Sequence, residues 1–172
     1  VATVLSGAEA ALSGFEPRSV LLYLRSALSP LAQDLCDEVE NYAVIWQIRG
    51  AKWTQPWVNH PDGLSDQWTD RDQAALERLE GARAMSIEPL HRLRSGFLDA
   101  RDLRQQVQAL YTFLEEIDLA NRLSELAREL DEAGDNRSAQ ILDQLWEILL
   151  GALEQLDAVL GESKWEPEAF SR

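Results

Sequence analysis

The sequence predicts an all-α fold, a bundle of about seven helices interrupted by one long irregular loop at about residues 49–68. Three observations lead to this prediction. Apolar residues recur at spacings of three and four along most of the 172-residue chain, no window alternates with period two over a strand length, and proline and glycine separate the helical segments. Hydrophobic residues make up 45% of the chain, which is enough for an ordinary core.

Three helices are expected in the first 48 residues. The first covers residues 1–14. Pro17 can stand in the first turn of the second helix, where its missing N–H costs nothing, and Pro30 ends that helix. The third runs from about Leu31 to Ile48, with Gly50 as its expected stop. Their core-facing stripes are Val1, Leu5, Ala8 and Leu12; Leu21, Leu24 and Leu28; and Leu35, Val39, Tyr42 and Trp46.

Residues 49–68 lose the helical period and contain two prolines and two glycines. Loops of this length in compact domains are unusual and tend to be functional. Helix resumes near Asp70, with inward-facing residues that include Leu76 and Phe97. Pro89 falls inside this helix, so we expect a kink or a break there.

The last three helices have the most regular patterns. Apolar residues alternate at spacings of four and three over Leu103–Ile117 and again over Leu119–Leu130. Gly134 is expected to stop the second of these helices and Asp135 to cap the next. The final helix carries a wide apolar stripe around Trp146 that reaches Leu160, so we expect it to be the most buried helix and Trp146 to be a core residue.

The charge of the chain limits its partners. Thirty acidic residues against sixteen basic ones give a net charge of -14, and over residues 119–172 twelve acids stand against five bases. Such a surface repels phosphate backbones, which excludes a basic nucleic-acid module of the usual kind and confines any DNA contact to the front half. No apolar run approaches the roughly 20 residues that span a bilayer, so no membrane partner is expected.

The termini and the single cysteine give further expectations. The chain begins at Val1 without Met, and we expect residues 1–172 to be a single helical domain, a fragment of a longer chain. One cysteine, Cys36, excludes an internal disulfide and an all-cysteine zinc or iron–sulfur site within the chain, and it fits a cytoplasmic location.

No catalytic, cofactor-binding or metal site is expected in these residues. A phosphate-binding loop needs glycines followed by Lys and Ser or Thr, but Trp follows both Lys52 and Lys164. His60 and His91 have no partners at metal-ligand spacing and are treated as ordinary surface or loop histidines. Cys36 is expected to be a buried structural thiol.

Two groups of basic residues could contact DNA. In the loop, Arg49, Lys52, Trp53 and Trp57 combine bases with aromatics, which can neutralise phosphates and stack on unpaired bases, and no Asp or Glu occurs from Arg49 to Pro61. The alternative is that the tryptophans pin the loop onto the bundle. A second group covers His91, Arg92, Arg94, Arg101 and Arg104, for which the alternative is a helix face balanced by acids from its neighbours.

Five segments follow one another in order over nearly the whole chain. They are Val20–Leu28, Glu40-Asn41-Tyr42 followed by Ile48-Arg49-Gly50-Ala51-Lys52-Trp53, Glu88-Pro89-Leu90, Ala109–Glu116 and Gln144-Leu145-Trp146. The second resembles the stretch L-E-N-Y … I-x-G-x-x-W of the AddB family, and the ordered set resembles the same family. AddB is the B subunit of the bacterial ATP-dependent helicase–nuclease that processes double-strand breaks.

The resemblance implies a helical insertion in the UvrD-like motor half of such a protein. It implies a non-catalytic module, because the ATP motifs, the nuclease and its cysteine-ligated cluster lie elsewhere in the family. An AddA-like helicase/nuclease subunit and DNA ends are the implied partners of the complex, and ATP, Mg and an iron–sulfur cluster are its implied cofactors. The alternative, which the charge of -14 favours, is a helical protein–protein interaction adaptor with no nucleic-acid role.

Overall fold

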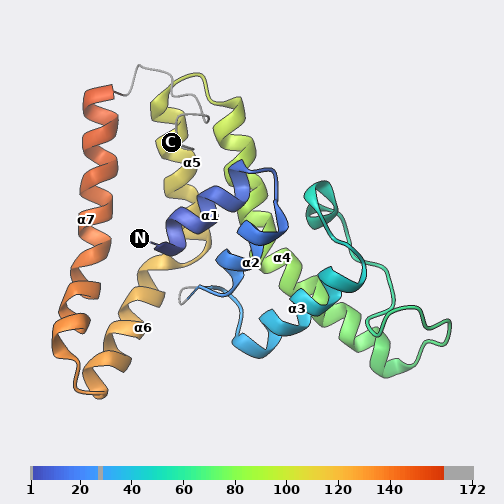
Figure 1. Cartoon of the computed structure of the whole chain (residues 1–172). Coiled ribbons are helices and arrows are strands. Elements are labelled where there is room, and N and C mark those ends of the chain that lie inside the picture. The colour runs from blue at the N-terminus through green and yellow to red at the C-terminus, as the bar shows by residue number, and fades with distance from the viewer. Residues whose placement is uncertain (1, 27–28, 161–172) are drawn as a thin grey trace. The chain divides into compact units, whose positions relative to one another are not determined.

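The computed structural model describes residues 2–26 and 29–160, and within them the fold is all-α, without a strand (Figure 1). The predicted fold class is confirmed. The described helices are α1 (Ala2–Leu12), α2 (Pro17–Leu24), α3 (Gln33–Ile45), the 3₁₀-helix η1 (Gly50–Thr54), α4 (Asp70–Asp99), α5 (Leu103–Glu116), α6 (Leu119–Glu132) and α7 (Asn136–Leu160). Val1, Leu28 and the side chain of Leu160, which were assigned to apolar stripes, lie outside the described residues.

The chain divides into two compact units, residues 1–94 and residues 95–172. The first contains α1–α3, the long loop and most of α4, and the second contains α5–α7. The first unit has 13 acids and 9 bases, whereas the second has 17 acids and 7 bases. Most of the negative charge therefore belongs to the second unit. That residues 1–172 fold as one domain stays a prediction.

Local capping sets the ends of the first three helices. Gly14, with φ +76°, closes α1, and the Phe15 N–H donates to the carbonyl of Ala10 at 3.0 Å. Pro17 stands in the first turn of α2 as predicted, and the Glu16 carboxylate accepts the Ser19 N–H at 3.0 Å. α3 ends at Ile45, earlier than predicted: Gln47, with φ +51°, already adopts a left-handed conformation two residues after the helix, and Gly50, with φ +52°, adopts one further along.

Helix α4 is continuous through Pro89, so the break allowed by the sequence does not occur. Pro89 has no N–H to donate to the carbonyl of Met85, but Met85 is 56% exposed, so water can reach that part of the helix. The fully buried side chains of Ile87 and Leu90 flank the proline. Their burial offsets the lost hydrogen bond and keeps this stretch helical.

In the second unit, α5 and α6 follow one another and α7 returns antiparallel to α6, in contact with both (Figure 1). Both predicted caps around residue 134 are confirmed. Gly134 has φ +85°, and the Asp135 carboxylate accepts the Ser138 N–H at 3.1 Å.

The prediction that α7 is the most buried helix is wrong. Among its described side chains only Ala139 and Leu153 are buried, whereas Ile148 is 62% and Val159 77% exposed. Trp146 is only half-buried, so it lies at the edge of the core. The reason is that α5 and α6 cover one side of a stripe that extends further around the helix. None of the described helices combines the length and apolar character needed to cross a membrane.

Candidate nucleic-acid interface

Side chains from α3 and its C-terminal end hold the backbone of the long loop. The Tyr42 hydroxyl accepts the Asn59 N–H at 3.0 Å and donates to the Asn59 carbonyl at 3.3 Å. The Trp46 indole N–H donates to the His60 carbonyl at 3.0 Å. One segment of the loop is thus fixed through its main chain, whatever its side chains.

Helix α4 holds the other part of the loop through an ion pair. The Glu80 carboxylate accepts the Trp57 N–H at 2.9 Å, and Arg83 donates to the same carboxylate at 2.6 and 2.8 Å and to the Trp53 carbonyl at 3.3 Å. Burial alone would raise the pKa of Glu80, but the Arg83 hydrogen bonds and charge, together with the Trp57 N–H, lower that pKa below its ordinary value. Glu80 is therefore ionised at neutral pH.

The two central tryptophans of the loop are buried, Trp53 fully and Trp57 with 4% exposure. Trp57 stacks on Tyr42 with ring centroids 4.6 Å apart, and Trp53 lies tilted against Trp57 at 5.7 Å. The Trp53 indole N–H has no acceptor among the described residues, so this side chain contributes by packing rather than by hydrogen bonding.

The burial of Trp53 and Trp57 argues against the expectation that their rings stack on DNA bases. Neither Trp53 nor Trp57 has a free face on which a base could stack, because both rings are buried where the loop packs against α3 and α4. The structure favours the alternative in which the tryptophans pin the loop to the helices.

The two bases of the loop remain on the surface. Lys52 is exposed, and its ammonium donates to the carbonyls of Trp46 and Gln47, both at 3.4 Å, at the C-terminal end of α3. Arg49 is exposed, and its guanidinium forms no hydrogen bond or ion pair within the part of the chain that the structure describes. Arg49 is thus available to a ligand, whereas Lys52 is engaged weakly.

A groove of about 620 Å³ lies beside Arg49, between the start of α2 and the end of α3. Arg18, which the sequence pattern did not indicate, lines the same groove; it is exposed and likewise has no hydrogen-bond or ion-pair partner among the described residues. The one carboxylate in the lining, Glu16, already caps α2. Apolar side chains, among them Leu21 and Val44, complete the wall. Two unpaired guanidiniums on a partly apolar groove can bind an anion such as a phosphate.

The second group of bases does not form a free basic face. Arg94 donates to the carbonyls of Ala11 and Leu12, at 2.9 and 3.1 Å. Arg92 pairs with Glu88 at 3.8 Å, and Arg104 pairs with Asp157 at 2.7 Å. For Arg92 and Arg104 the alternative of charge balanced by acids applies, whereas Arg94 is held by main-chain carbonyls.

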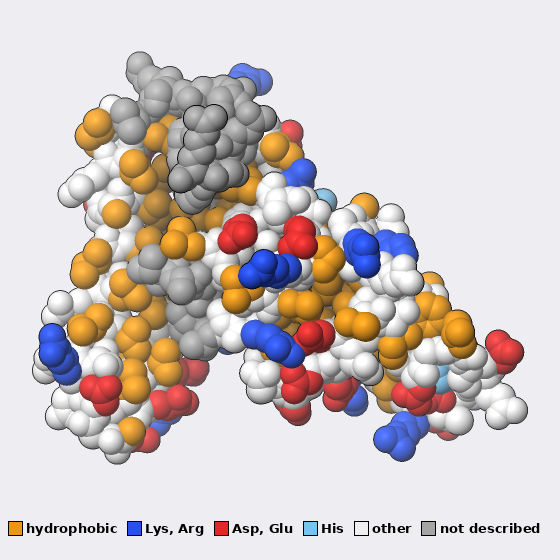
Figure 2. Space-filling view, in the orientation of Figure 1, with side chains coloured by type: hydrophobic (Ala, Val, Ile, Leu, Met, Phe, Trp, Pro, Cys, Tyr) orange, Lys and Arg blue, Asp and Glu red, His pale blue; other side chains and the backbone are white. Residues whose placement is uncertain are grey.

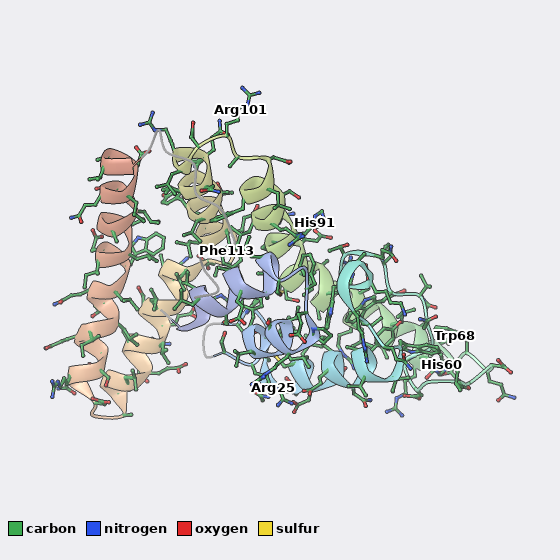
Figure 3. All side chains as sticks on the ribbon, turned by 45° about the horizontal axis from the view of Figure 1, so that its top comes forward. Arg25, His60, Trp68, His91, Arg101 and Phe113 are labelled. Atoms are coloured by element: carbon green, nitrogen blue, oxygen red, sulfur yellow. The ribbon has the colours of Figure 1, made fainter. Side chains whose placement is uncertain are left out.

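His60 is buried at the far end of the loop, edge-on to Trp68 with ring centroids 4.7 Å apart (Figure 3). Its Nδ1 accepts the Asp62 N–H, and its Nε2 lies 3.1 Å from the Gln67 carbonyl. The Thr69 hydroxyl and N–H donate to Asp72 and lower the pKa of that carboxyl. These bonds hold the loop before α4, which gives His60 a structural role.

The described residues contain no group of three His, Cys, Asp or Glu side chains that could hold a metal ion. Cys36 is buried, its thiol donates to the Leu24 carbonyl at 3.0 Å, and burial raises its pKa. The raised pKa makes the thiol a poor nucleophile.

Comparison with known proteins connects this geometry to a family. No family model matches the chain. The B subunit of an ATP-dependent helicase/deoxyribonuclease from Thermoanaerobacter sp. (strain X514) is 30% identical over 165 residues, which are 94% of this chain and 14% of that protein. The sequence is AddB-like. The B subunit of the same name from Anoxybacillus flavithermus is 30% identical over 78% of this chain, and that of Caldanaerobacter subterraneus subsp. tengcongensis is 26% identical over 98%. The AddB-like chain spans about one seventh of the length of these curated relatives, 12–15% in each case.

Proposed function

We propose that this AddB-like chain is a non-catalytic helical module of a longer AddB-type protein, in an ATP-dependent helicase/exodeoxyribonuclease that processes DNA double-strand breaks for recombinational repair. The observation that carries the proposal is 30% identity over 94% of the chain to the B subunit of an enzyme of that kind. In this proposal the complex contains an AddA-like helicase/nuclease subunit. ATP, Mg and any iron–sulfur cluster bind outside this segment in the proposal, which is consistent with the lack of a group of three metal-ligating side chains among the described residues.

The proposed DNA contact is the groove lined by Arg18 and Arg49. Three features support it: both guanidiniums lack an internal partner among the described residues, the groove lies in the less acidic unit, and its only carboxylate is already engaged. Arg18 and Arg49 bind phosphates in this proposal. Lys52 adds positive charge nearby, while Trp53 and Trp57 hold the loop in place.

The test compares the DNA affinity of the intact helicase–nuclease complex containing the wild-type AddB-like protein with that of the complex containing its Arg18→Ala/Arg49→Ala variant. Loss of two phosphate contacts should weaken binding across DNA sequences and flatten the slope of log Kobs against log[salt] by up to about 0.9 per phosphate. Arg78→Ala is the matched control, because Arg78 is 55% exposed and already paired with Glu38 at 2.6 Å. It should leave both quantities unchanged.

An unchanged affinity and salt slope in the double variant would refute the DNA contact. The second candidate, a protein-interaction adaptor with no nucleic-acid role, would then account for the charge of -14. Both candidates predict that the isolated chain does not hydrolyse ATP or cut DNA.

A further inference from the structure

Helix α7 has apolar residues on two sides, and the described residues of its own unit cover only one of them. Ile141, Ile148, Leu156 and Val159 are 57%, 62%, 42% and 77% exposed, and we call these four residues the outer stripe. Their spacings of seven, eight and three place them along one line of a helix with 3.6 residues per turn. Figure 2 shows hydrophobic side chains along the exposed side of α7.

A stripe of this kind is a binding surface rather than an ordinary helix exterior. Single exposed apolar residues are normal, but several in a row on one element mark an interaction site. A helix that is apolar well around its circumference is normally buried. The neighbours of α7 in its own unit, α5 and α6, pack on the side that holds Ala139 and Leu153.

The charge of the unit that contains α7 limits what can cover the outer stripe. Residues 95–160 contain 14 acids and 5 bases, and Arg104 and Arg128 are already paired with Asp157 and Glu132. DNA and anionic lipid are repelled by such a surface. A second copy of the chain would bring the same excess of acids. The complementary partner is an amphipathic helix with an apolar stripe bordered by Lys and Arg.

We propose that the outer stripe of α7 docks a basic amphipathic helix from another part of the same AddB-like polypeptide. This inference rests on the proposed function, in which the chain is a segment of a longer protein; the relatives are about seven times longer than the part it matches. A helix in the same polypeptide is present at an effective concentration of the order of mM, so it occupies the stripe in preference to a separate protein.

The test measures how fast maleimide labels a cysteine placed on the stripe. Ile148→Cys is compared with Asp143→Cys, an exposed position on the same helix but off the stripe. Cys36 contributes little background, because it is buried and its pKa is raised. Both introduced cysteines should react rapidly in the 172-residue chain. In the full-length AddB-like protein alone, Ile148→Cys should react at least about tenfold more slowly, and Asp143→Cys at an unchanged rate.

Each other outcome overturns the proposal. Equal rates in the full-length protein would show that the stripe stays open, and protection that appears only after the AddA-like partner is added would assign the stripe to that partner. Protection within the 172-residue chain that increases with its concentration would point to a second copy. Labelling is read without DNA, so this result is independent of the phosphate-contact test.

Discussion

Replacing Arg83 by methionine tests whether the ion pair on α4 holds the loop. The Arg83 side chain is 6% exposed, and methionine keeps much of its length while removing every bond to Glu80 and to the Trp53 carbonyl. Leaving one member of a buried pair without its partner costs about 3–5 kcal/mol. The Glu80 side chain is 31% exposed, so water reaches it, and we expect a smaller loss of about 2–3 kcal/mol in the free energy of unfolding.

The assay is urea unfolding, followed by circular dichroism and tryptophan fluorescence, of Arg83→Met, Glu80→Gln and the double variant. If the two residues stabilise the fold as a pair, the double variant should lose less than the sum of the single losses, with a coupling energy of about 1–2 kcal/mol. A coupling below about 0.3 kcal/mol would refute the reasoning, because additivity is then the better description.

Acid should weaken this coupling. The pKa of Glu80 is lowered in the folded protein, so its contribution is complete above the unfolded value of about 4.3 and is lost as the pH falls through the lower folded value. The loss caused by Arg83→Met should therefore be largest near neutral pH and smaller below about pH 4. A loss that is independent of pH would show that Glu80 is not the partner that matters.

Two further predictions concern the helices themselves. Trp146→Ala should lower the free energy of unfolding by about 1–3 kcal/mol, less than for a fully buried Trp, because the ring is half-buried. A thermal midpoint that falls as far as for Trp53→Ala would contradict this. Gly134→Ala should lower the free energy of unfolding by about 1 kcal/mol, because a Cβ is disfavoured at φ +85°. Gln47→Gly, at φ +51°, should raise it by a similar amount. Denaturant midpoints of Gly134→Ala and Gln47→Gly measure these two effects. If both variants shift the midpoint in the same direction, the reasoning from backbone conformation is refuted.

The pattern of apolar residues predicted the helices well, because each one depends on local spacing and caps. Pro17, Gly134 and Asp135 act as the sequence indicates. The break allowed at Pro89 does not occur, because burial of Ile87 and Leu90 offsets the proline. The third helix ends before the expected stop at Gly50, because Gln47 already adopts a left-handed conformation.

The site was predicted less well, because it depends on which side chains already have partners. The sequence singled out Arg49 as a DNA contact, which stays a prediction, and it could not show that Trp53 is covered or that Lys52 reaches the end of α3. It missed Arg18, which lines the same groove as Arg49 only in the folded arrangement of α2 and α3. The sequence did contain a signal for Arg18. Arg18 follows Pro17, which opens the helix, and the nearby carboxylate of Glu16 is expected to cap that helix and so not to pair with Arg18.

The loop is attached to the helices through the buried rings of Trp53 and Trp57 and also through its own peptide groups. Those peptide groups belong to Trp53, Trp57, Asn59 and His60, and the side chains that hold them are Tyr42, Trp46, Glu80 and Arg83. A main-chain contact is indifferent to the side chain that the same residue carries. Related proteins can therefore exchange solvent-facing residues of this segment, such as Val58 and Asn59, without losing its course over the helices. For protein engineering, the solvent-facing positions of this segment are a place to graft foreign side chains, provided that the four anchoring side chains and the buried Trp53, Trp57 and His60 are kept.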